Sequence, residues 1–233
     1  ILSSHTRVFG AGELKNLGDI MRSIQSRFKS KAPYPNSVRM LDPITACNLG
    51  ERYVAEVQDL ADRGDFDRIT DKMPGNHTNL GLLASILPKA RVVHCMRNPM
   101  DSCFSNFSHN FASVISFSRD LEWLGHHYKD YRRIMEHWKK VLPLEIMELR
   151  YEDMIADNEG MSKKLIDFVG LDWDPACLEF QKTERRVKTA STVQIRQPIY
   201  SSSVARWRRY EEQLKPLYDT LGEWAPDEND NYK

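Results

Sequence analysis

The fold class follows from the stretch Val92-Val93-His94-Cys95-Met96-Arg97-Asn98-Pro99-Met100-Asp101-Ser102-Cys103-Phe104-Ser105-Asn106-Phe107. Its apolar, β-branched beginning over 92–96 predicts a strand that is covered on both faces, as in a parallel sheet. Asn98-Pro99 breaks this strand, and proline suits the first turn of a helix, which we expect over 101–110. The stretch therefore predicts a strand that turns directly into a helix.

Arg97 lies at the carboxyl end of this strand. In open α/β sheets, ligands bind beyond the carboxyl ends of the strands, where a following helix points its free N–H groups. The hydroxyl of Ser105, early in that helix, can lie near the Arg97 guanidinium. Together they predict a site for one phosphate. The alternative is a plain β-α unit in which Arg97 pairs with a carboxylate and Ser105 packs.

The rest of the chain alternates strands with helices, which is typical of a parallel sheet with right-handed crossovers. Lys72 lies at the carboxyl end of one predicted strand and Tyr151 follows another, so we expect them on the same ligand-binding edge as Arg97. Further strands are expected over 66–73 and 144–149, and helices over 14–28, 43–63, 79–87, 121–141 and 158–169.

Two segments outside this alternation carry polar groups. Residues 8–14 predict a glycine-hinged loop whose only acid is Glu13; the alternative is a carboxylate that interacts with a helix dipole. Residues 191–210 combine hydroxyls, amides and four arginines. This composition predicts a loop that covers a phosphate ligand at least as much as it predicts a solvated basic connector. Residues 226–233 form a polar tail that we expect to be frayed.

Composition excludes several classes of partner. The 33 basic and 33 acidic residues give a formal charge of zero, so no global field favours nucleic acid or an anionic membrane. The four cysteines lack metal-binding spacing, which favours free thiols in a reducing, cytoplasmic compartment and no metal. No stretch is long enough to span a bilayer.

At this point the chain resembles a known family. Arg97-x-Pro-x-Asp-x-x-x-Ser105 after a hydrophobic strand resembles the 3'-phosphate-binding motif of sulfotransferases that use 3'-phosphoadenosine 5'-phosphosulfate (PAPS). Four further sequence segments resemble the branch of tyrosylprotein sulfotransferases and their bacterial relatives that often carry tetratricopeptide repeats. These segments are Gly10-Ala-Gly-Glu13, Asp71-Lys72-Met73-Pro74, Arg150-Tyr151-Glu152 and residues 191–207.

The resemblance implies a sulfotransferase fold over residues 1–225, a P-loop-type parallel sheet flanked by helices. It also implies that PAPS donates a sulfonate to an acceptor hydroxyl and leaves as 3'-phosphoadenosine 5'-phosphate (PAP). The acceptor classes are a peptide tyrosine, a carbohydrate or a small molecule, and a homodimer is left open. In-line transfer of this kind depends mainly on positioning and charge stabilisation.

The family's catalytic residues carry over to four positions. Glu13 matches the general base, a role that suits a partly desolvated carboxylate. Lys72 matches the lysine that stabilises the charge growing on the transferring sulfonate and bridging oxygen. Thr192, or Ser191 if the alignment shifts by one, matches a hydroxyl on the same sulfonate. The nucleotide contacts are matched by Arg97 and Ser105 on the 3'-phosphate and by Tyr151. Gln194, Ser201 and Arg206 match contacts from the closing segment, the loop over 192–201 with Arg206 that closes over the nucleotide.

Two departures from the family pattern stand out. His109 occupies the place of a further phosphate-binding arginine. The first strand and the 5'-phosphosulfate loop, a Pro-Arg-Ser-Gly-Thr-like sequence, are missing, and residues 1–4 read as the end of the helix that follows them. This leaves a catalytically silent nucleotide-binding or scaffolding domain as the alternative. A P-loop kinase-like enzyme would need a Gly-Lys-Ser/Thr cradle and acidic Mg²⁺ ligands, which we do not find.

Overall fold

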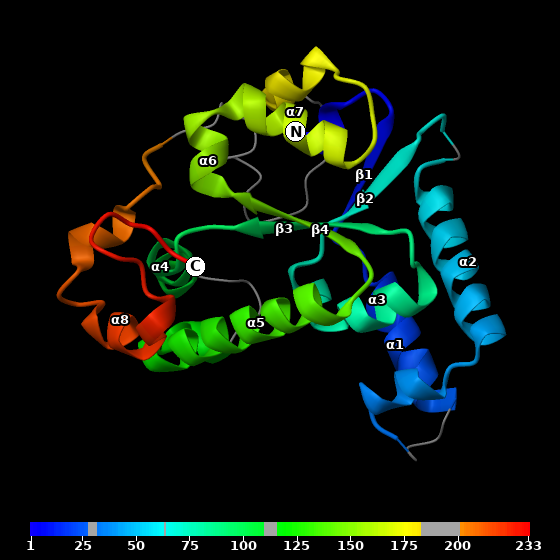
Figure 1. The fold of residues 1–233 in the computed structure, drawn as a ribbon, viewed down its shortest axis with the longest axis horizontal. Helices are drawn as coiled ribbons and strands as arrows, with labels where there is room; N and C mark the ends of the chain where they lie inside the picture. The colour runs from blue at the N-terminus through cyan, green and yellow to red at the C-terminus, as the bar shows by residue number, and fades with distance from the viewer. Residues whose placement is uncertain (28–31, 63, 110–115, 183–200) are drawn as a thin grey trace.

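The computed structural model describes residues 1–27, 32–62, 64–109, 116–182 and 201–233. Within them, the strands form two parallel pairs (Figure 1). β1 (Val8–Gly12) pairs with β2 (Arg68–Asp71), and β3 (Arg91–Met96) pairs with β4 (Glu145–Arg150). The strand that was predicted from residues 92–96 is therefore confirmed, and Arg97 follows its carboxyl end.

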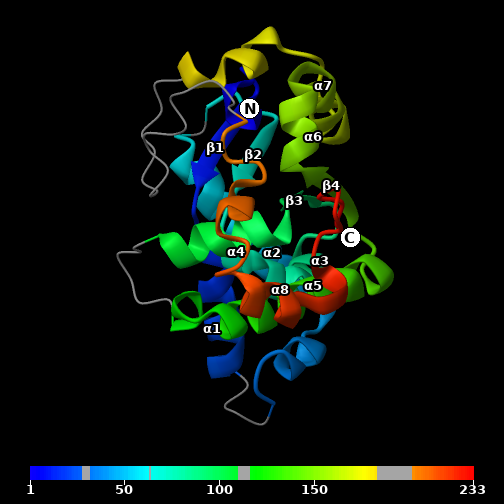
Figure 2. The same cartoon turned by 90° about the vertical axis from the view of Figure 1, so that its left-hand side faces the viewer.

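Helices cover the strands on two sides. In Figures 1 and 2, α6 and α7 lie on one side of the strands, and α3, α5 and α8 lie on the other. None of the described helices is both long and apolar enough to cross a membrane. The helices are α1 (Asn16–Arg27), α2 (Pro43–Leu60), α3 (Leu80–Ile86), α4 (Pro99–Ser108), α5 (Leu121–Val141), α6 (Tyr151–Ala156), α7 (Asn158–Phe168) and α8 (Lys215–Leu221).

Apolar faces at helical spacing build the core. Leu17, Ile20 and Ile24 of α1 are almost fully buried and pack with α3. A second cluster joins α4 and α5 to α8, with Leu217 fully buried. Burial of such a side chain contributes roughly 1.5–3 kcal/mol. The second cluster fixes α4, and with it the chain that follows Arg97.

The segment predicted as a glycine-hinged loop is instead strand β1, so that prediction is wrong. Phe9 lies opposite Ile69, and Val8 is buried. Two glycines weaken the local strand signal, but parallel pairing with β2 supplies the missing order. Gly12 has φ of +80°, which glycine adopts without steric cost. The chain turns at this residue, where β1 ends, and Glu13 is the first residue after the strand.

The tail was predicted to be frayed, and this is also wrong: residues 226–233 pack back onto the fold (Figure 2). The Tyr232 hydroxyl donates to a Glu152 carboxylate oxygen at 2.7 Å, and Arg150 donates to the Tyr232 carbonyl at 2.9 Å. Asp230 accepts from the Trp207 indole at 3.3 Å. These polar contacts bind a segment whose composition alone indicates a solvated end.

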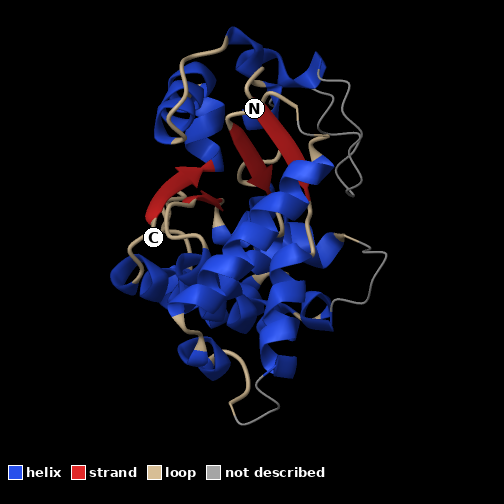
Figure 3. Ribbon diagram, turned by 90° about the vertical axis from the view of Figure 1, so that its right-hand side faces the viewer, coloured by secondary structure: helices blue, strands red, loops and turns tan. Residues whose placement is uncertain are grey.

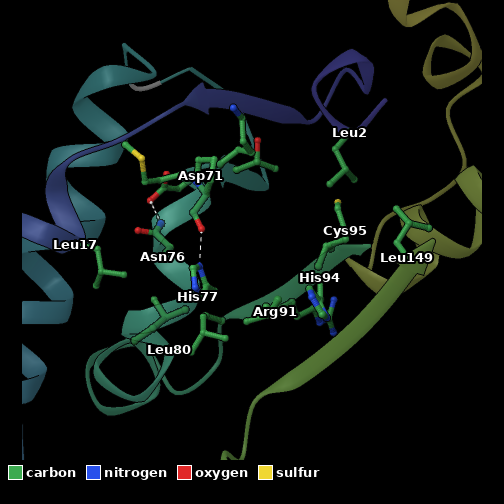
Figure 4. A pocket seen from close by; sticks show the side chains of 18 of the residues that line it. Leu2, Leu17, Asp71, Asn76, His77, Leu80, Arg91, His94, Cys95 and Leu149 are labelled. Atoms are coloured by element: carbon green, nitrogen blue, oxygen red, sulfur yellow. Dashed lines mark hydrogen bonds between the residues drawn. The ribbon is translucent and has the colours of Figure 1, made fainter. Parts of the chain in front are cut away.

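The two strand pairs are not hydrogen-bonded to each other (Figure 3). A cavity of about 2470 Å³ lies between them, and every residue of β2 and of β3 lines it. Its wall includes Leu2, Leu80 and Leu149 (Figure 4). Strands β2 and β3 thus each have one edge that opens onto this cavity.

Candidate functional site

The structure brings three predicted site residues to one cavity. Lys72 follows β2, Arg97 follows β3, and Tyr151 follows β4. All three line the cavity between the strand pairs. This is the arrangement expected of a ligand site beyond the carboxyl ends of parallel strands.

Glu13 and Lys72 are in direct contact. The Lys72 ammonium donates to a Glu13 carboxylate oxygen, and the two side chains are 61% and 38% exposed, respectively. Behind them, the Lys72 N–H donates to the Gly12 carbonyl at 2.7 Å. The backbone pairing of β1 with β2 thus continues one residue past the end of β2, and it holds the predicted base beside the predicted charge-stabilising lysine.

Asp71, for which no role was predicted from the sequence, holds the backbone next to this pair in place. One carboxylate oxygen accepts from the Leu14 N–H at 3.3 Å, and the other accepts from the Tyr53 hydroxyl at 2.9 Å and from Asn76 at 3.1 Å (Figure 4). Burial raises the pKa of the Asp71 carboxyl, and these hydrogen bonds act against that rise. Asp71 therefore ties the turn carrying Glu13 to the end of β2.

Arg97 presents an unsatisfied donor. Its Nη2 donates to the Ser203 carbonyl at 2.5 Å, and its guanidinium lies 5.3 Å from the centre of the Tyr151 ring. Its Nε is buried and has no hydrogen-bond partner. A buried, unpaired N–H is costly, and an anion is the partner that a guanidinium binds best.

The N-terminus of α4 does not offer free N–H groups, contrary to the prediction. The Asn98 side chain accepts from the Met100 and Asp101 N–H groups at 2.9 and 3.3 Å. This cap satisfies the donors that an anion would otherwise use. Anion binding at this strand end is thereby left to the Arg97 side chain.

Ser105 is exposed on α4 and lines the same cavity as Arg97, although no hydrogen bond joins the two within the described residues. Arg206 also lines the cavity, with its guanidinium 5.4 Å from the Phe104 ring centre. Ser201 is exposed, as is His109 at the end of α4. Thr192, Ser191 and Gln194 lie outside the described residues.

Comparison with known proteins decides the family. A sequence model of the Sulfotransferase family matches residues 1–175. This chain belongs to the sulfotransferase family. The resemblance found in its motifs is therefore confirmed at the level of the family.

Three relatives show how much of each protein this chain covers. An uncharacterized protein of Aquifex aeolicus is 38% identical over 230 residues, which are 96% of this chain and 30% of that protein. Sulfotransferase 2A6 of Rattus norvegicus is 29% identical over 46% of this chain and 40% of its own. Omega-hydroxy-beta-dihydromenaquinone-9 sulfotransferase of Mycobacterium bovis is 27% identical over 43% of this chain and 28% of its own. The chain thus spans less than half of each relative.

Solved structures confirm the fold. The sulfotransferase domain of the Synechococcus PCC 7002 olefin synthase superposes with a TM-score of 0.52 at 15% identity, covering 86% of both chains. The sulfotransferase domain of the curacin biosynthetic pathway superposes with a TM-score of 0.51 at 14% identity, covering 92% of this chain and 90% of that one. The predicted α/β sulfotransferase fold is therefore confirmed.

The described residues of this chain fit a phosphate-bearing ligand. Arg97, Lys72 and Arg206 bring three cations to one cavity, and the Arg97 Nε is an unpaired buried donor. Among the described residues, no group of three or more histidine, cysteine or acidic side chains is placed to hold a metal ion.

Proposed function

We propose that this protein transfers the sulfonate of PAPS to an acceptor hydroxyl. The observation that carries the proposal is the contact between Glu13 and Lys72, because Lys72 lines the same cavity as Arg97. A carboxylate and an ammonium held side by side can serve the two ends of one displacement. One takes a proton from the nucleophile, and the other stabilises the growing negative charge.

Glu13 is the proposed general base, and it takes the proton from the acceptor hydroxyl at a carboxylate oxygen. Its side chain is 38% exposed, so an acceptor can reach it. Lys72 donates from Nζ to the charge that develops on the sulfonate and the bridging oxygen. An incoming anion competes with Glu13 for Lys72, which frees the carboxylate to accept a proton. Thr192, or Ser191, is the proposed hydroxyl on the same sulfonate.

PAPS, when bound, supplies an activated sulfonate whose leaving group is a phosphate. Arg97 would hold the 3'-phosphate, since its buried Nε lacks a partner, and Ser105 would add a hydroxyl from α4. Tyr151, against which the Arg97 guanidinium stacks, would flank the nucleotide. Gln194, Ser201 and Arg206 complete the proposed nucleotide contacts from the closing segment.

The cavity between β2 and β3 suggests a place for a further strand. We infer that it accepts the strand that the resemblance places before the 5'-phosphosulfate loop, because the facing edges of β2 and β3 are both open. The acceptor is a hydroxyl of a peptide tyrosine, a carbohydrate or a small molecule. The proposal that the chain belongs to the tyrosylprotein-like branch rests on the sequence motifs that resemble that branch.

Transfer of radiolabelled sulfonate from PAPS tests the proposal, with tyrosine peptides, sugars and phenols as acceptors. Glu13→Gln should abolish most transfer while retaining PAP binding. Glu159→Gln is the matched control, because Glu159 is also an exposed acid paired with a lysine, but on α7 and away from the cavity. PAP binding without transfer to any acceptor class would favour the silent nucleotide-binding domain. Equal transfer by Glu13→Gln and the unaltered chain would remove Glu13 from the mechanism.

A further inference from the structure

Asp101 is the acid of the Arg97-x-Pro-x-Asp motif, and its side chain is completely buried. An ionised carboxylate in such a place is costly unless hydrogen bonds and a charge compensate it. Its two oxygens accept from the backbone N–H groups of Ala205 at 2.7 Å and Trp207 at 3.0 Å. The Arg97 guanidinium lies 3.9 Å away. The motif is thus tied to a segment more than one hundred residues later.

The contacts follow every second residue of that segment. Arg97 donates to the Ser203 carbonyl, and Asp101 accepts from the Ala205 and Trp207 N–H groups. Ala205 has φ of +53°, a left-handed conformation that non-glycine residues adopt rarely and that surrounding structure must hold in place. The two hydrogen bonds to Asp101 flank Arg206, which lines the cavity.

We propose that Asp101 is a positioning residue that clamps residues 203–207 onto α4 and so places Arg206 beside Arg97 at the anion site. This role rests on the proposed function. The carboxylate lies beside Arg97, and it acts by fixing two backbone positions around the second cation, Arg206. Burial raises the pKa of its carboxyl, and the Trp207 N–H and the Arg97 guanidinium act against that rise.

A double-mutant cycle separates positioning from general support of the fold. Calorimetry would measure PAP affinity in the unaltered chain, in Asp101→Asn, in Arg206→Ala and in the double variant. The carboxamide keeps one acceptor oxygen, so one of the two N–H groups loses its partner. We expect Asp101→Asn to weaken the affinity for PAP by about tenfold in the unaltered background. In the Arg206→Ala background we expect little further loss.

Asp174→Asn is the matched control. Asp174 likewise accepts from two backbone N–H groups, those of Thr6 and Ala176, each at 2.9 Å, but it does not line the cavity. Asp174→Asn should destabilise the fold without weakening the affinity for PAP. Equal losses from Asp101→Asn in both backgrounds, or no loss at all, would overturn the positioning role.

Amide hydrogen exchange covers the case in which Asp101→Asn does not fold. In the unaltered chain, the Ala205 and Trp207 amides should exchange slowly even without ligand, and fast exchange at both would overturn the clamp. If the unaltered chain does not bind PAP, the proposed function fails, and the positioning role fails with it. If the unaltered chain binds PAP and Asp101→Asn binds it equally well, only the positioning role fails.

Discussion

Replacing Asp71 by alanine should uncouple Glu13 from Lys72. The substitution leaves the Leu14 N–H, the Tyr53 hydroxyl and the Asn76 amide without their shared acceptor. Each hydrogen bond to a charged group contributes about 1.5–3 kcal/mol, and the donors that can reach water lose little. We therefore expect a loss of about 2–4 kcal/mol in the free energy of unfolding, measured by urea denaturation. Sulfonate transfer should fall at least tenfold at temperatures where the variant is folded.

The Tyr53→Phe variant removes one contact of Asp71 without releasing the turn that carries Glu13. It removes one donor to Asp71 and leaves the bond from the Leu14 N–H in place. We expect a stability loss of about 1 kcal/mol and unchanged transfer. If Tyr53→Phe lowered transfer as much as Asp71→Ala, or if Asp71→Ala transferred sulfonate at the original rate, the reasoning that the turn is clamped by Asp71 would be refuted.

Three further predictions follow from buried or open groups. Burial lowers the pKa of His94 to about 4, so between pH 6.5 and 4 the unfolded chain binds a proton that the folded chain excludes. Urea denaturation should therefore show that the free energy of unfolding decreases as the pH is lowered through this range. The decrease should be up to about 3 kcal/mol larger than in His94→Phe. Tyr232→Phe removes the hydrogen bond to Glu152 and should cost about 1–2 kcal/mol in thermal or urea unfolding, and an unchanged stability would show that the tail is not docked. N-ethylmaleimide should label Cys95 in this chain, and more slowly in a chain extended upstream through the proposed strand, whereas exposed Cys47 on α2 should react equally in both.

Local signals were sufficient where one segment carries the whole pattern. The apolar run before Arg97 and the Asn98-Pro99 break identify β3 and α4, because burial and helix initiation depend on neighbouring residues. The same signals place Lys72 and Arg97 after parallel strands, and the structure puts both on one cavity.

Contacts between residues far apart in the chain could not be predicted from the sequence. β1 depends on hydrogen bonds to β2, so its glycines read as a loop. Asp71 and Asp101 act through backbone N–H groups distant along the chain, and nothing near either residue indicates which N–H groups those are. The charged tail reads as solvated, since its partners Glu152 and Arg150 lie on another element.

Calorimetric titration of PAP into this chain tests the central claim most directly. Arg97→Ala is compared with Arg133→Ala, an exposed arginine of α5 that does not line the cavity. The unaltered chain and Arg133→Ala should bind PAP with equal affinity, and Arg97→Ala should lose most of it, because a guanidinium–phosphate pair is removed. Equal binding by Arg97→Ala, or no binding by any form, would contradict the assignment of this cavity as a site for a 3'-phosphorylated nucleotide.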